Sequence, residues 1–279
     1  MSDSASPIYA FSPGTSPLLI SVPHAGTEVP VELRRRFTSS AQSLPDTDWH
    51  VDRLYELTLT LARELGASLL VATHSRYVVD LNRSPDSAAL YANEPTSPVC
   101  PDRTFAGDPI YMSAEGLQPA EIQARIGCYW RPYHERLEQE LARLRAEHGF
   151  ALLWDAHSVA SEVPGLFQGV LPEFNFGSRD NAACPRDVAQ ALLDVVTRDA
   201  KYDAVLDGRF KGGYITLHYG QPAQKIYAIQ LELAQRAYLD EGAPRDWDAA
   251  RAQGAASVIA QLLERYVEEG RRRLGEKRL

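Results

Sequence analysis

Cysteine is scarce in this sequence of 279 residues, and the few cysteines lie far apart. There are three, Cys100, Cys128 and Cys184, and no two of them form a CxxC pair. An odd number of widely spaced cysteines argues against a disulfide framework and against a zinc site built from cysteine. A reducing cytoplasm is the simplest compartment for a protein with this cysteine usage.

Long hydrophobic runs are missing as well. Residues 18–22 and 67–72 are the longest, and both are far shorter than the roughly 20 apolar residues of a membrane-spanning helix. Residues 1–17 have neither the basic segment nor the apolar core that signal peptides carry. The sequence therefore predicts a cytoplasmic protein that has no membrane partner.

The sequence has fewer basic than acidic residues. Its 29 lysines and arginines and 37 aspartates and glutamates give a net charge of −8. Nucleic-acid-binding proteins usually carry a basic stripe, and no such stripe is present, so no nucleic-acid partner is expected. An acidic protein that binds an acidic small molecule must instead gather its cations in one cleft. The sequence does not specify an oligomeric state.

Several common catalytic motifs are absent from the sequence. It contains no HExxH, no GxSxG, no GxxxxGK[ST] and no GxGxxG after a strand. These absences argue against a classical zinc protease, a serine hydrolase, a phosphate-loop protein and a dinucleotide-dependent dehydrogenase.

Hydrophobic periodicity predicts that strands and helices alternate along the chain. Strands are expected at residues 18–22, 67–72, 76–81, 150–154, 203–207, 213–218 and 226–233. Helices are expected at residues 46–65, 119–148 (broken or kinked at Pro132), 186–199 and 247–274, with a long loop at 84–117. This order favours one α/β domain over residues 1–279, with a mostly parallel or mixed central sheet flanked by helices.

Polar or ionisable residues occur at the ends of four of the expected strands. His24 follows the first strand, Asn82 and Arg83 follow residues 76–81, His157 follows residues 150–154, and Glu232 lies near the end of residues 226–233. Ligands of open α/β sheets bind just beyond the carboxyl ends of the strands. We therefore expect these side chains to meet in one site.

His24 and His157 are the leading candidate metal ligands, because each comes from a strand end where its side chain is held and partly removed from water. Zinc prefers neutral imidazole nitrogen and carboxylate oxygen, and its catalytic sites keep one position open. Asp155, two residues before His157, is placed to orient a ligand imidazole. A histidine hydrogen-bonded to backbone is the alternative for either one alone.

The third ligand is expected to be a carboxylate or another histidine. We choose Asp48, from a segment of residues 45–52 that is rich in acidic residues. Asp52, His50, Asp46 and Glu28 are the alternatives for this ligand. The acidic residues of this segment are also typical of the first turn of a helix.

Arg76, Asn82 and Arg83 lie on one expected strand, where alternation places Arg76 and Asn82 on the same face. An arginine fork beside an amide suits a substrate carboxylate. The alternative is an arginine paired with Asp80. Further along the chain, Lys211 or Arg209 can supply another cation and His218 can face the cleft, although a surface hairpin explains that segment equally well.

Six segments together make the chain recognisable. They are LLISVPHAG at 18–26, LPDTDWHVDRLY at 44–55, SRYVVDLNR at 75–83, LLWDAHS at 152–158, GRFKGGYITLHYG at 208–220 and AIQLELAQRAY at 228–238. With these segments the chain resembles the N-formylglutamate amidohydrolase (deformylase) family. That family is similar in turn to zinc carboxypeptidases and to the aspartoacylase and succinylglutamate desuccinylase group, so the resemblance implies a phosphorylase/hydrolase-like α/β fold with one zinc ion.

The resemblance also implies roles for individual residues. His24 and His157 match the two metal-binding histidines, and Glu232 fits the general base on a late strand. Asn82 and Arg83 match the pair that holds the carboxylate of the amino acid, while Arg76 matches an arginine that stabilises the oxyanion. The relatives usually place a glutamate three residues after the first histidine, where this chain has Thr27. Asp48 is chosen as the remaining ligand for that reason.

The expected activity is hydrolysis of N-formyl-L-glutamate to L-glutamate and formate, which the resemblance places last in a route of histidine degradation. The expected cofactor is Zn²⁺, with another divalent metal as an alternative. Deacylation of succinylglutamate or of an acylaspartate is the nearest competing activity, and a carboxypeptidase-like peptidase is the next. A non-catalytic protein that binds an acidic ligand would not need His24, Asp155, His157 and Glu232 together.

Overall fold

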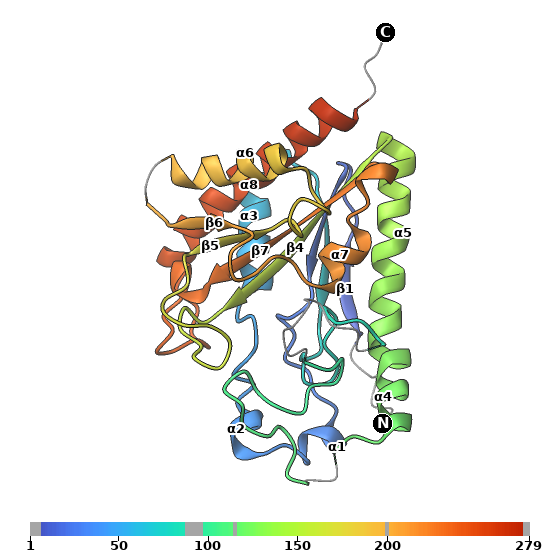
Figure 1. Cartoon of the computed structure of the whole chain (residues 1–279), viewed down its shortest axis with the longest axis vertical. Helices are drawn as coiled ribbons and strands as arrows, with labels where there is room; N and C mark the ends of the chain where they lie inside the picture. The colour runs from blue at the N-terminus through green and yellow to red at the C-terminus, as the bar shows by residue number, and fades with distance from the viewer. Residues whose placement is uncertain (1–6, 87–96, 114–115, 199–200, 276–279) are drawn as a thin grey trace.

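A computed structural model describes residues 7–86, 97–113, 116–198 and 201–275 (Figure 1). Its centre is a seven-stranded mixed sheet in the order β1-β3-β2-β4-β7-β5-β6. The strands are β1 (Tyr9–Ser12), β2 (Leu18–Val22), β3 (Ser68–Ala72), β4 (Ala151–Val159), β5 (Phe174–Gly177), β6 (Ala204–Leu206) and β7 (Ile226–Ala234). The α/β architecture expected from the sequence is confirmed.

Four neighbouring parallel strands, β3, β2, β4 and β7, form the middle of the sheet. Strand β4 pairs in parallel with β2 on one side and with β7 on the other, whereas β1 and β5 run antiparallel to their neighbours β3 and β7. The long strands β4 and β7 are paired over nine residues, and this register places His157 opposite Glu232. The carboxyl ends of β2, β4 and β7 therefore meet at one edge of the sheet.

Helices cover both faces of the sheet (Figure 1). One face packs against α3 (Val51–Leu61), α6 (Arg186–Thr197) and α8 (Ala249–Leu274) in the larger hydrophobic core. The other packs against α4 (Pro119–Arg125), α5 (Arg131–His148) and α7 (Tyr214–Tyr219). In the larger core, the fully buried Trp154 of β4 donates a hydrogen bond of 2.5 Å to the Tyr55 hydroxyl, which fixes α3 against the sheet.

A smaller lobe lies beyond the carboxyl ends of the central strands, at the bottom of Figure 1. It contains the short helices α1 (Val31–Arg34) and α2 (Ser39–Gln42) together with irregular chain around residues 75–83 and 97–111. Leu33, Phe37, Tyr77 and Ile110 are buried in its separate hydrophobic cluster. The lobe faces the edge where the candidate site residues are expected.

Two of the expected strands are wrong. Residues 76–81 form turns, because this segment bends away from the sheet and directs Arg76 and Asp80 toward His24. Residues 213–218 were expected to extend as a strand but belong to helix α7, which begins after Gly213 and ends before Gly220. Strands β1 and β5 and the helices α1 and α2 were not expected, since all four are only four residues long.

Two expected helices differ from the structure in their details. The helix expected at residues 46–65 begins only at Val51, because His50 has a left-handed φ of 59° that ends the preceding turn. The helix expected at residues 119–148 is interrupted by a π-helical segment, Ile126–Trp130. Pro132 lies in the first turn of α5, where proline is tolerated, so the interruption comes before the proline.

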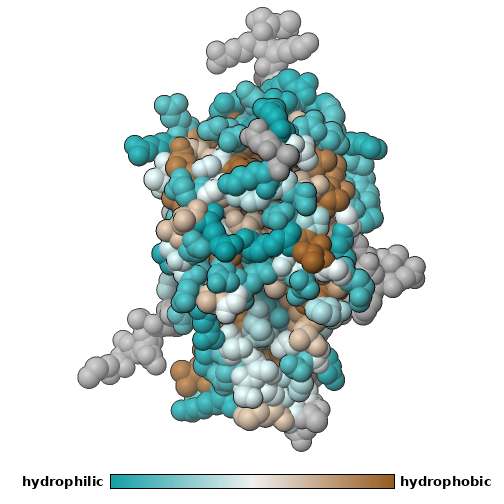
Figure 2. All heavy atoms as spheres, turned by 90° about the vertical axis from the view of Figure 1, so that its left-hand side faces the viewer, coloured by the Kyte–Doolittle hydropathy of each residue, from teal (hydrophilic) through white to brown (hydrophobic). Residues whose placement is uncertain are grey.

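The described residues contain no helix long and apolar enough to cross a membrane. The face shown in Figure 2 is mostly hydrophilic, with apolar side chains scattered over it. All three cysteines are free, and Cys128 is the exposed one.

Gly26 permits a close backbone approach beside the site. A Cβ atom there would lie 2.4 Å from the Thr73 carbonyl carbon and 2.6 Å from the His74 nitrogen, and neither backbone atom can move independently. We expect Gly26→Ala to lower the free energy of unfolding by about 1–3 kcal/mol, the usual cost of overpacking. Urea unfolding followed by circular dichroism measures it.

Gly127→Ala is the matched control for this prediction. A Cβ atom at Gly127 meets no atom within 4 Å, and the residue lies in helical chain. Alanine is preferred over glycine in helices by about 1 kcal/mol, so this variant is expected to be as stable as wild type or more so. A Gly26→Ala protein of wild-type stability would contradict the packing argument.

Candidate metal and catalytic site

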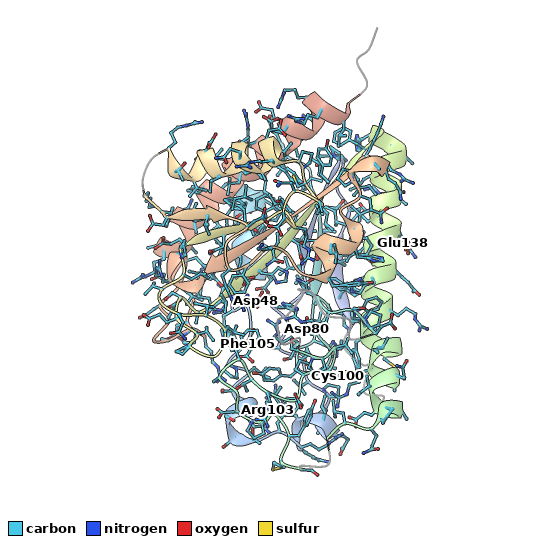
Figure 3. All side chains as sticks on the ribbon, in the orientation of Figure 1. Asp48, Asp80, Cys100, Arg103, Phe105 and Glu138 are labelled. Carbon is cyan, nitrogen blue, oxygen red and sulfur yellow. The ribbon has the colours of Figure 1, made fainter. Side chains whose placement is uncertain are left out.

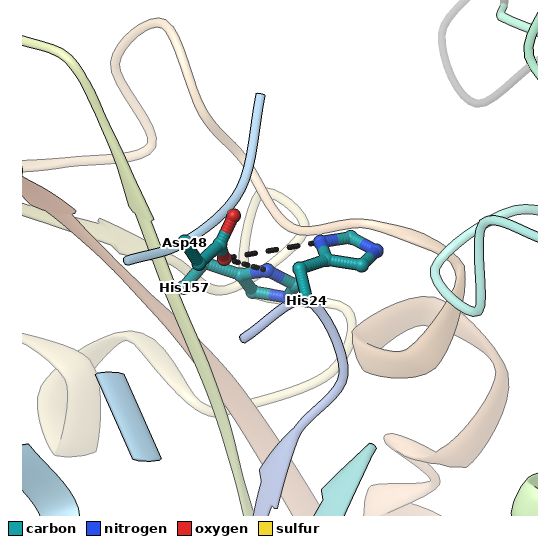
Figure 4. A group of neighbouring side chains, drawn as sticks. All are labelled: His24, Asp48 and His157. Atoms are coloured by element: carbon teal, nitrogen blue, oxygen red, sulfur yellow. Dashed lines mark hydrogen bonds and ion pairs between the residues drawn. The ribbon is translucent and has the colours of Figure 1, made fainter. Parts of the chain in front are cut away.

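Two histidines and one aspartate meet at the carboxyl edge of the sheet (Figure 4). His24 follows β2, His157 lies in β4, and Asp48 comes from the turn before α3. Asp48 Oδ2 is 3.3 Å from His157 Nδ1 and 3.8 Å from His24 Nδ1. One ligand atom from each residue lies within 4.8 Å of the others, and all three side chains are buried. The site thus joins residues from three separate parts of the sequence.

Each histidine directs its other ring nitrogen toward a carboxylate. His24 Nε2 is 2.9 Å from Asp80 Oδ1, and His157 Nε2 is 3.1 Å from Asp155 Oδ1. Histidines that bind metals are commonly oriented by a carboxylate in this way. Both Nδ1 atoms are therefore left facing Asp48.

The donor atoms fit a divalent cation. Among the described residues, the buried atom His24 Nδ1 has no hydrogen-bond partner, and burying a polar atom unpaired is costly. Two imidazole nitrogens and one carboxylate oxygen form a donor set that catalytic zinc sites use, with a further position left open. The residues present therefore match the metal that the resemblance implies.

Charge at the site favours a cation as well. Asp48, Asp80 and Asp155 are all at most 1% exposed, and the buried cation beside them is Arg76. Burial lowers the pKa of His24, which favours a neutral imidazole. Burial alone would also lower the pKa of His157, but the neighbouring Asp155 and Asp48 carboxylates hold it well above its usual value. Burial alone would raise the pKa of Asp48, but the hydrogen bond from His157 and the nearby positive charges lower it.

Glu232 lies across the β4–β7 ladder from His157 and lines the cavity beside the cluster. Burial raises the pKa of its carboxyl group to about 8. Gln230 donates a hydrogen bond of 2.9 Å from Nε2 to Glu232 Oε2, and its Oε1 accepts one from the Gly213 nitrogen. The Gln230 amide is therefore held in one orientation and fixes the Glu232 carboxyl group. A carboxyl group with a pKa near neutrality can both accept and return a proton.

Arg76 lies beside the cluster although it is not on a strand. Its Nη2 is 2.7 Å from Asp80 Oδ2, its Nη1 is 3.6 Å from Asp48 Oδ1, and its guanidinium group stacks on Phe105. The pairing with Asp80 that the sequence offered as an alternative is therefore formed. It does not remove Arg76 from the site, since Arg76 also lines the cavity.

The cluster opens into a cavity of about 470 Å³ between the sheet edge and the smaller lobe. Figure 3 shows Asp48 and Asp80 at this level of the molecule, with Phe105 just below them. The walls of this cavity include His24, His157 and Glu232, the arginines Arg76, Arg83, Arg103 and Arg209, and Asn82. Three arginines in addition to Arg76 therefore line one cleft, together with the carboxyl groups of Asp46, Asp80, Asp102 and Glu232.

Lys211 and His218 are placed outside the residues that line this cavity. Lys211 Nζ lies 3.0 Å from Asp180, and His218 is exposed on α7, where its ring stacks on Tyr214. The sequence offered Lys211 or Arg209 as a further cation and His218 as a residue that can face the cleft. Of these three, Arg209 lines the cavity.

The alternatives to Asp48 lie outside the cluster. The Asp46 carboxylate accepts hydrogen bonds from the Tyr77 hydroxyl and the Phe105 nitrogen, and His50 Nε2 is 2.9 Å from the Arg245 carbonyl oxygen. Glu28 is exposed, and Asp52 lies in the first turn of α3. Among these candidates only Asp48 brings a carboxylate oxygen to both histidines.

The sequence matches the family model described as N-formylglutamate amidohydrolase over residues 16–239. It is 48% identical over 268 residues to a Pseudomonas aeruginosa protein named N-formylglutamate deformylase, covering 95% of this chain and 98% of that protein. The chain belongs to the N-formylglutamate amidohydrolase family. A Pseudomonas putida protein of the same name is 45% identical over the same shares of the two chains.

Solved structures share the fold of this family member. An N-formylglutamate amidohydrolase from Ralstonia eutropha JMP134 superposes with a TM-score of 0.76 at 24% identity, covering 95% of this chain and 98% of that one. A gene product from Agrobacterium tumefaciens superposes with a TM-score of 0.73 at 18% identity, covering 96% and 98%. At such identities the likeness establishes the fold alone.

Three residues near the site had no role assigned from the sequence. Gln230 lies two residues before Glu232, so strand alternation was a signal that both face the same way. Asp80 was considered only as a partner of Arg76, although it also orients His24. Phe105 lies in the long loop and has no local signal, because the packing of the lobe brings it to Arg76.

We expect Asp48→Asn to weaken zinc binding by more than about 100-fold, beyond the 10–100-fold typical of residues that only orient a ligand. The neutral amide removes the anionic donor that both histidines face. Competition with a chromophoric chelator measures the affinity, and circular dichroism verifies the fold.

Asp52→Asn is the control, four positions along the chain and one of the alternative ligands. It is expected to bind zinc as wild type does. If Asp52→Asn lost zinc while Asp48→Asn kept it, the ligand assignment would have to be reversed.

Proposed function

We propose that this chain hydrolyses the formyl amide of N-formyl-L-glutamate. Water adds to the formyl carbon, the bond from that carbon to nitrogen breaks, and the products are formate and L-glutamate. The observation that supports this proposal most directly is the buried cluster of His24, Asp48 and His157 beside Glu232, in a cavity whose lining includes arginines. The identity to two proteins named N-formylglutamate deformylase supports this choice of substrate.

His24, Asp48 and His157 would hold the metal ion, and we propose Zn²⁺ from their chemistry. When bound, such an ion supplies Lewis-acid chemistry, which polarises a carbonyl group and lowers the pKa of water. Asp80 and Asp155 orient the two imidazoles. Another divalent ion suits the same donors, because such sites also follow metal availability.

Glu232 is proposed as the general base and acid. It takes a proton from the attacking water and delivers a proton to the leaving nitrogen, so the amine departs neutral. The raised pKa of about 8 suits both transfers near neutral pH. Gln230 keeps the carboxyl group directed by its fixed amide.

Arg76 is proposed to stabilise the oxyanion that forms as water adds. Its guanidinium group is held by Asp80 and by the Phe105 ring, so it needs little reorganisation when charge develops. Asp46 supports this arrangement because its carboxylate accepts a hydrogen bond of 2.9 Å from the Phe105 nitrogen.

The carboxylates of the substrate are proposed to bind along the arginine-lined wall. Arg83 and Asn82 bind the carboxylate of the amino acid, and Arg209 receives the second. Asn82 is itself held in place, since its Oδ1 accepts a hydrogen bond from the Ile215 nitrogen. Lys211, at the surface with Asp180, is omitted from this set.

We further propose a cytoplasmic location, which the three free cysteines support. The place of the reaction at the end of histidine degradation rests on the family resemblance. The competing substrates are N-succinyl-L-glutamate, N-acyl-L-aspartates and peptides with an acidic C-terminal residue.

Formate release from N-formyl-L-glutamate tests the proposal. We expect metal-loaded protein to release formate, chelation to abolish the release, and added Zn²⁺ to restore it. A coupled formate dehydrogenase assay measures the rate with the formyl substrate, and release of the free amino acid measures hydrolysis of the panel of competing substrates. Activity on succinylglutamate with none on formylglutamate would replace the proposed substrate, and activity indifferent to chelation would refute the metal.

Glu232→Gln tests the proton-transfer role in the same assay. We expect kcat to fall by about 10²–10⁴-fold, the usual contribution of a general acid–base, while zinc content and fold are kept. Gln is close in shape to Glu but cannot take up the proton. Near-normal turnover in this variant would remove Glu232 from the role.

Phe105 is expected to limit the size of the acyl group. Its ring covers Arg76 at 4.6 Å, next to the proposed position of the acyl oxygen, and a Cβ at Gly165 would lie only 2.1 Å from the Phe105 carbonyl oxygen, so the loops are closely packed there. We expect Phe105→Ala to raise kcat/KM for N-acetyl-L-glutamate relative to the formyl substrate by about 10-fold or more.

Phe210→Ala is the matched control, because Phe210 lines the cavity but does not stack on Arg76. Its acetyl-to-formyl ratio is expected to stay near that of wild type. An equal change in both variants would show that cavity volume in general, not Phe105, sets the acyl limit.

A further inference from the structure

Asp48 differs from the two histidines in how the fold supports it. His157 is held in β4 by ladders to its neighbours, and His24 directly follows the buried strand β2. Asp48 lies in irregular chain, before the left-handed His50 and the start of α3. A ligand on a loop needs support from elsewhere to keep its position within a fraction of an ångström.

Two side chains from one short turn provide that support. The 3₁₀ turn η3 (Gln235–Ala237) continues directly from β7, and Tyr238 follows it. Gln235 Nε2 donates a hydrogen bond of 3.0 Å to the Thr47 carbonyl oxygen. The Tyr238 hydroxyl donates one of 2.6 Å to the Trp49 carbonyl oxygen. The carbonyls immediately before and after Asp48 are therefore both held.

Further contacts join this arrangement to the cluster itself. The Tyr238 hydroxyl is 2.8 Å from Ser158 Oγ, and the Ser158 nitrogen donates to Asp48 Oδ2 at 3.0 Å. The Asp48 nitrogen donates to the His24 carbonyl oxygen at 3.1 Å. The Asp48 backbone is thus hydrogen-bonded to His24, and the Asp48 carboxylate is hydrogen-bonded to Ser158, the residue that follows His157.

Burial makes these bonds persistent. Tyr238 is fully buried and Gln235 is 5% exposed, so water does not readily replace either donor. Burial holds the pKa of the Tyr238 hydroxyl well above its usual value, and the group stays protonated as a donor. Breaking such a bond leaves a buried carbonyl oxygen unpaired, which costs about 1–3 kcal/mol.

We propose that Gln235 and Tyr238 are positioning residues that hold Asp48 in place for metal binding. They touch neither the metal donors nor the cavity walls and act through the Thr47 and Trp49 carbonyls. The segment AIQLELAQRAY thus has two tasks, since it carries Glu232 on β7 and the support for Asp48 just after it. This inference rests on the proposed metal site.

Metal affinity tests the inference without relying on turnover. We expect Tyr238→Phe and Gln235→Met each to weaken zinc binding about 10-fold and the double variant to weaken it up to about 100-fold, within the range for residues that orient ligands. Competition with a chromophoric chelator measures this affinity. Hydrogen exchange over residues 44–50 of the metal-free proteins is expected to become faster in the same variants.

Tyr266→Phe is the matched control. Tyr266 is also fully buried, and it packs on Trp154 in the larger core, among the residues of α8. Loss of its hydroxyl is expected to leave zinc affinity unchanged. Excess zinc is expected to restore kcat in Tyr238→Phe, whereas a protein that is merely less folded would not recover.

The outcomes separate this inference from the proposed function. If wild type binds zinc and folded Tyr238→Phe and Gln235→Met bind it equally well, the positioning role is overturned. If wild type binds no divalent metal, the proposed metal site fails and the inference fails with it. Should the double variant fail to fold, the single Tyr238→Phe substitution, which removes one oxygen atom, still decides the question.

Discussion

The accumulation of buried negative charge at one edge of the sheet is the constraint on which the site depends. Asp48, Asp80 and Asp155 are removed from water beside a single buried arginine, Arg76. Buried charges are costly unless they are paired or bind a metal. Two carboxylates meet this cost by orienting histidines, and the third faces both imidazoles. The proposed cation position is the point where the Nδ1 atoms converge on Asp48.

The pairing of the central strands determines where several of the site residues lie. Because β2, β4 and β7 are parallel neighbours, their carboxyl ends bring His24, His157 and Glu232 to the same edge without any help from loops. Asp48 and Arg76 come from irregular chain, and other side chains must hold them in place. Asp80 holds Arg76, while Gln235 and Tyr238 hold the chain around Asp48. The candidate site therefore combines side chains that the sheet positions with side chains that buried hydrogen bonds and ion pairs position.

This division explains how far the sequence could predict the molecule. His157 and Glu232 were identifiable because an apolar strand marks its own position and direction. From the sequence, Asp48 could be chosen as the candidate ligand, but Asp46 and Asp52 could not be excluded. The choice depends on the φ angle of His50 and on contacts with residues more than a hundred positions away. The strand expected at 76–81 was wrong for a related reason: Tyr77 and Val78 are buried in the smaller lobe, and Val79 and Leu81 are buried in the core beside α5. His218 was expected to face the cleft from residues 213–218, which were predicted as a strand but form helix α7.

Chemistry and selection accordingly come from different parts of the fold. The metal donors and Glu232 lie on or beside the sheet, whose core tolerates little change because its side chains are fully buried. Phe105 and Arg209 lie in loops, which are more tolerant of change. The contact between Phe105 and Arg76 connects the loops to the cluster at the sheet edge. Arg76 is proposed to stabilise the oxyanion, and Phe105, which stacks on it, is proposed to limit the size of the acyl group.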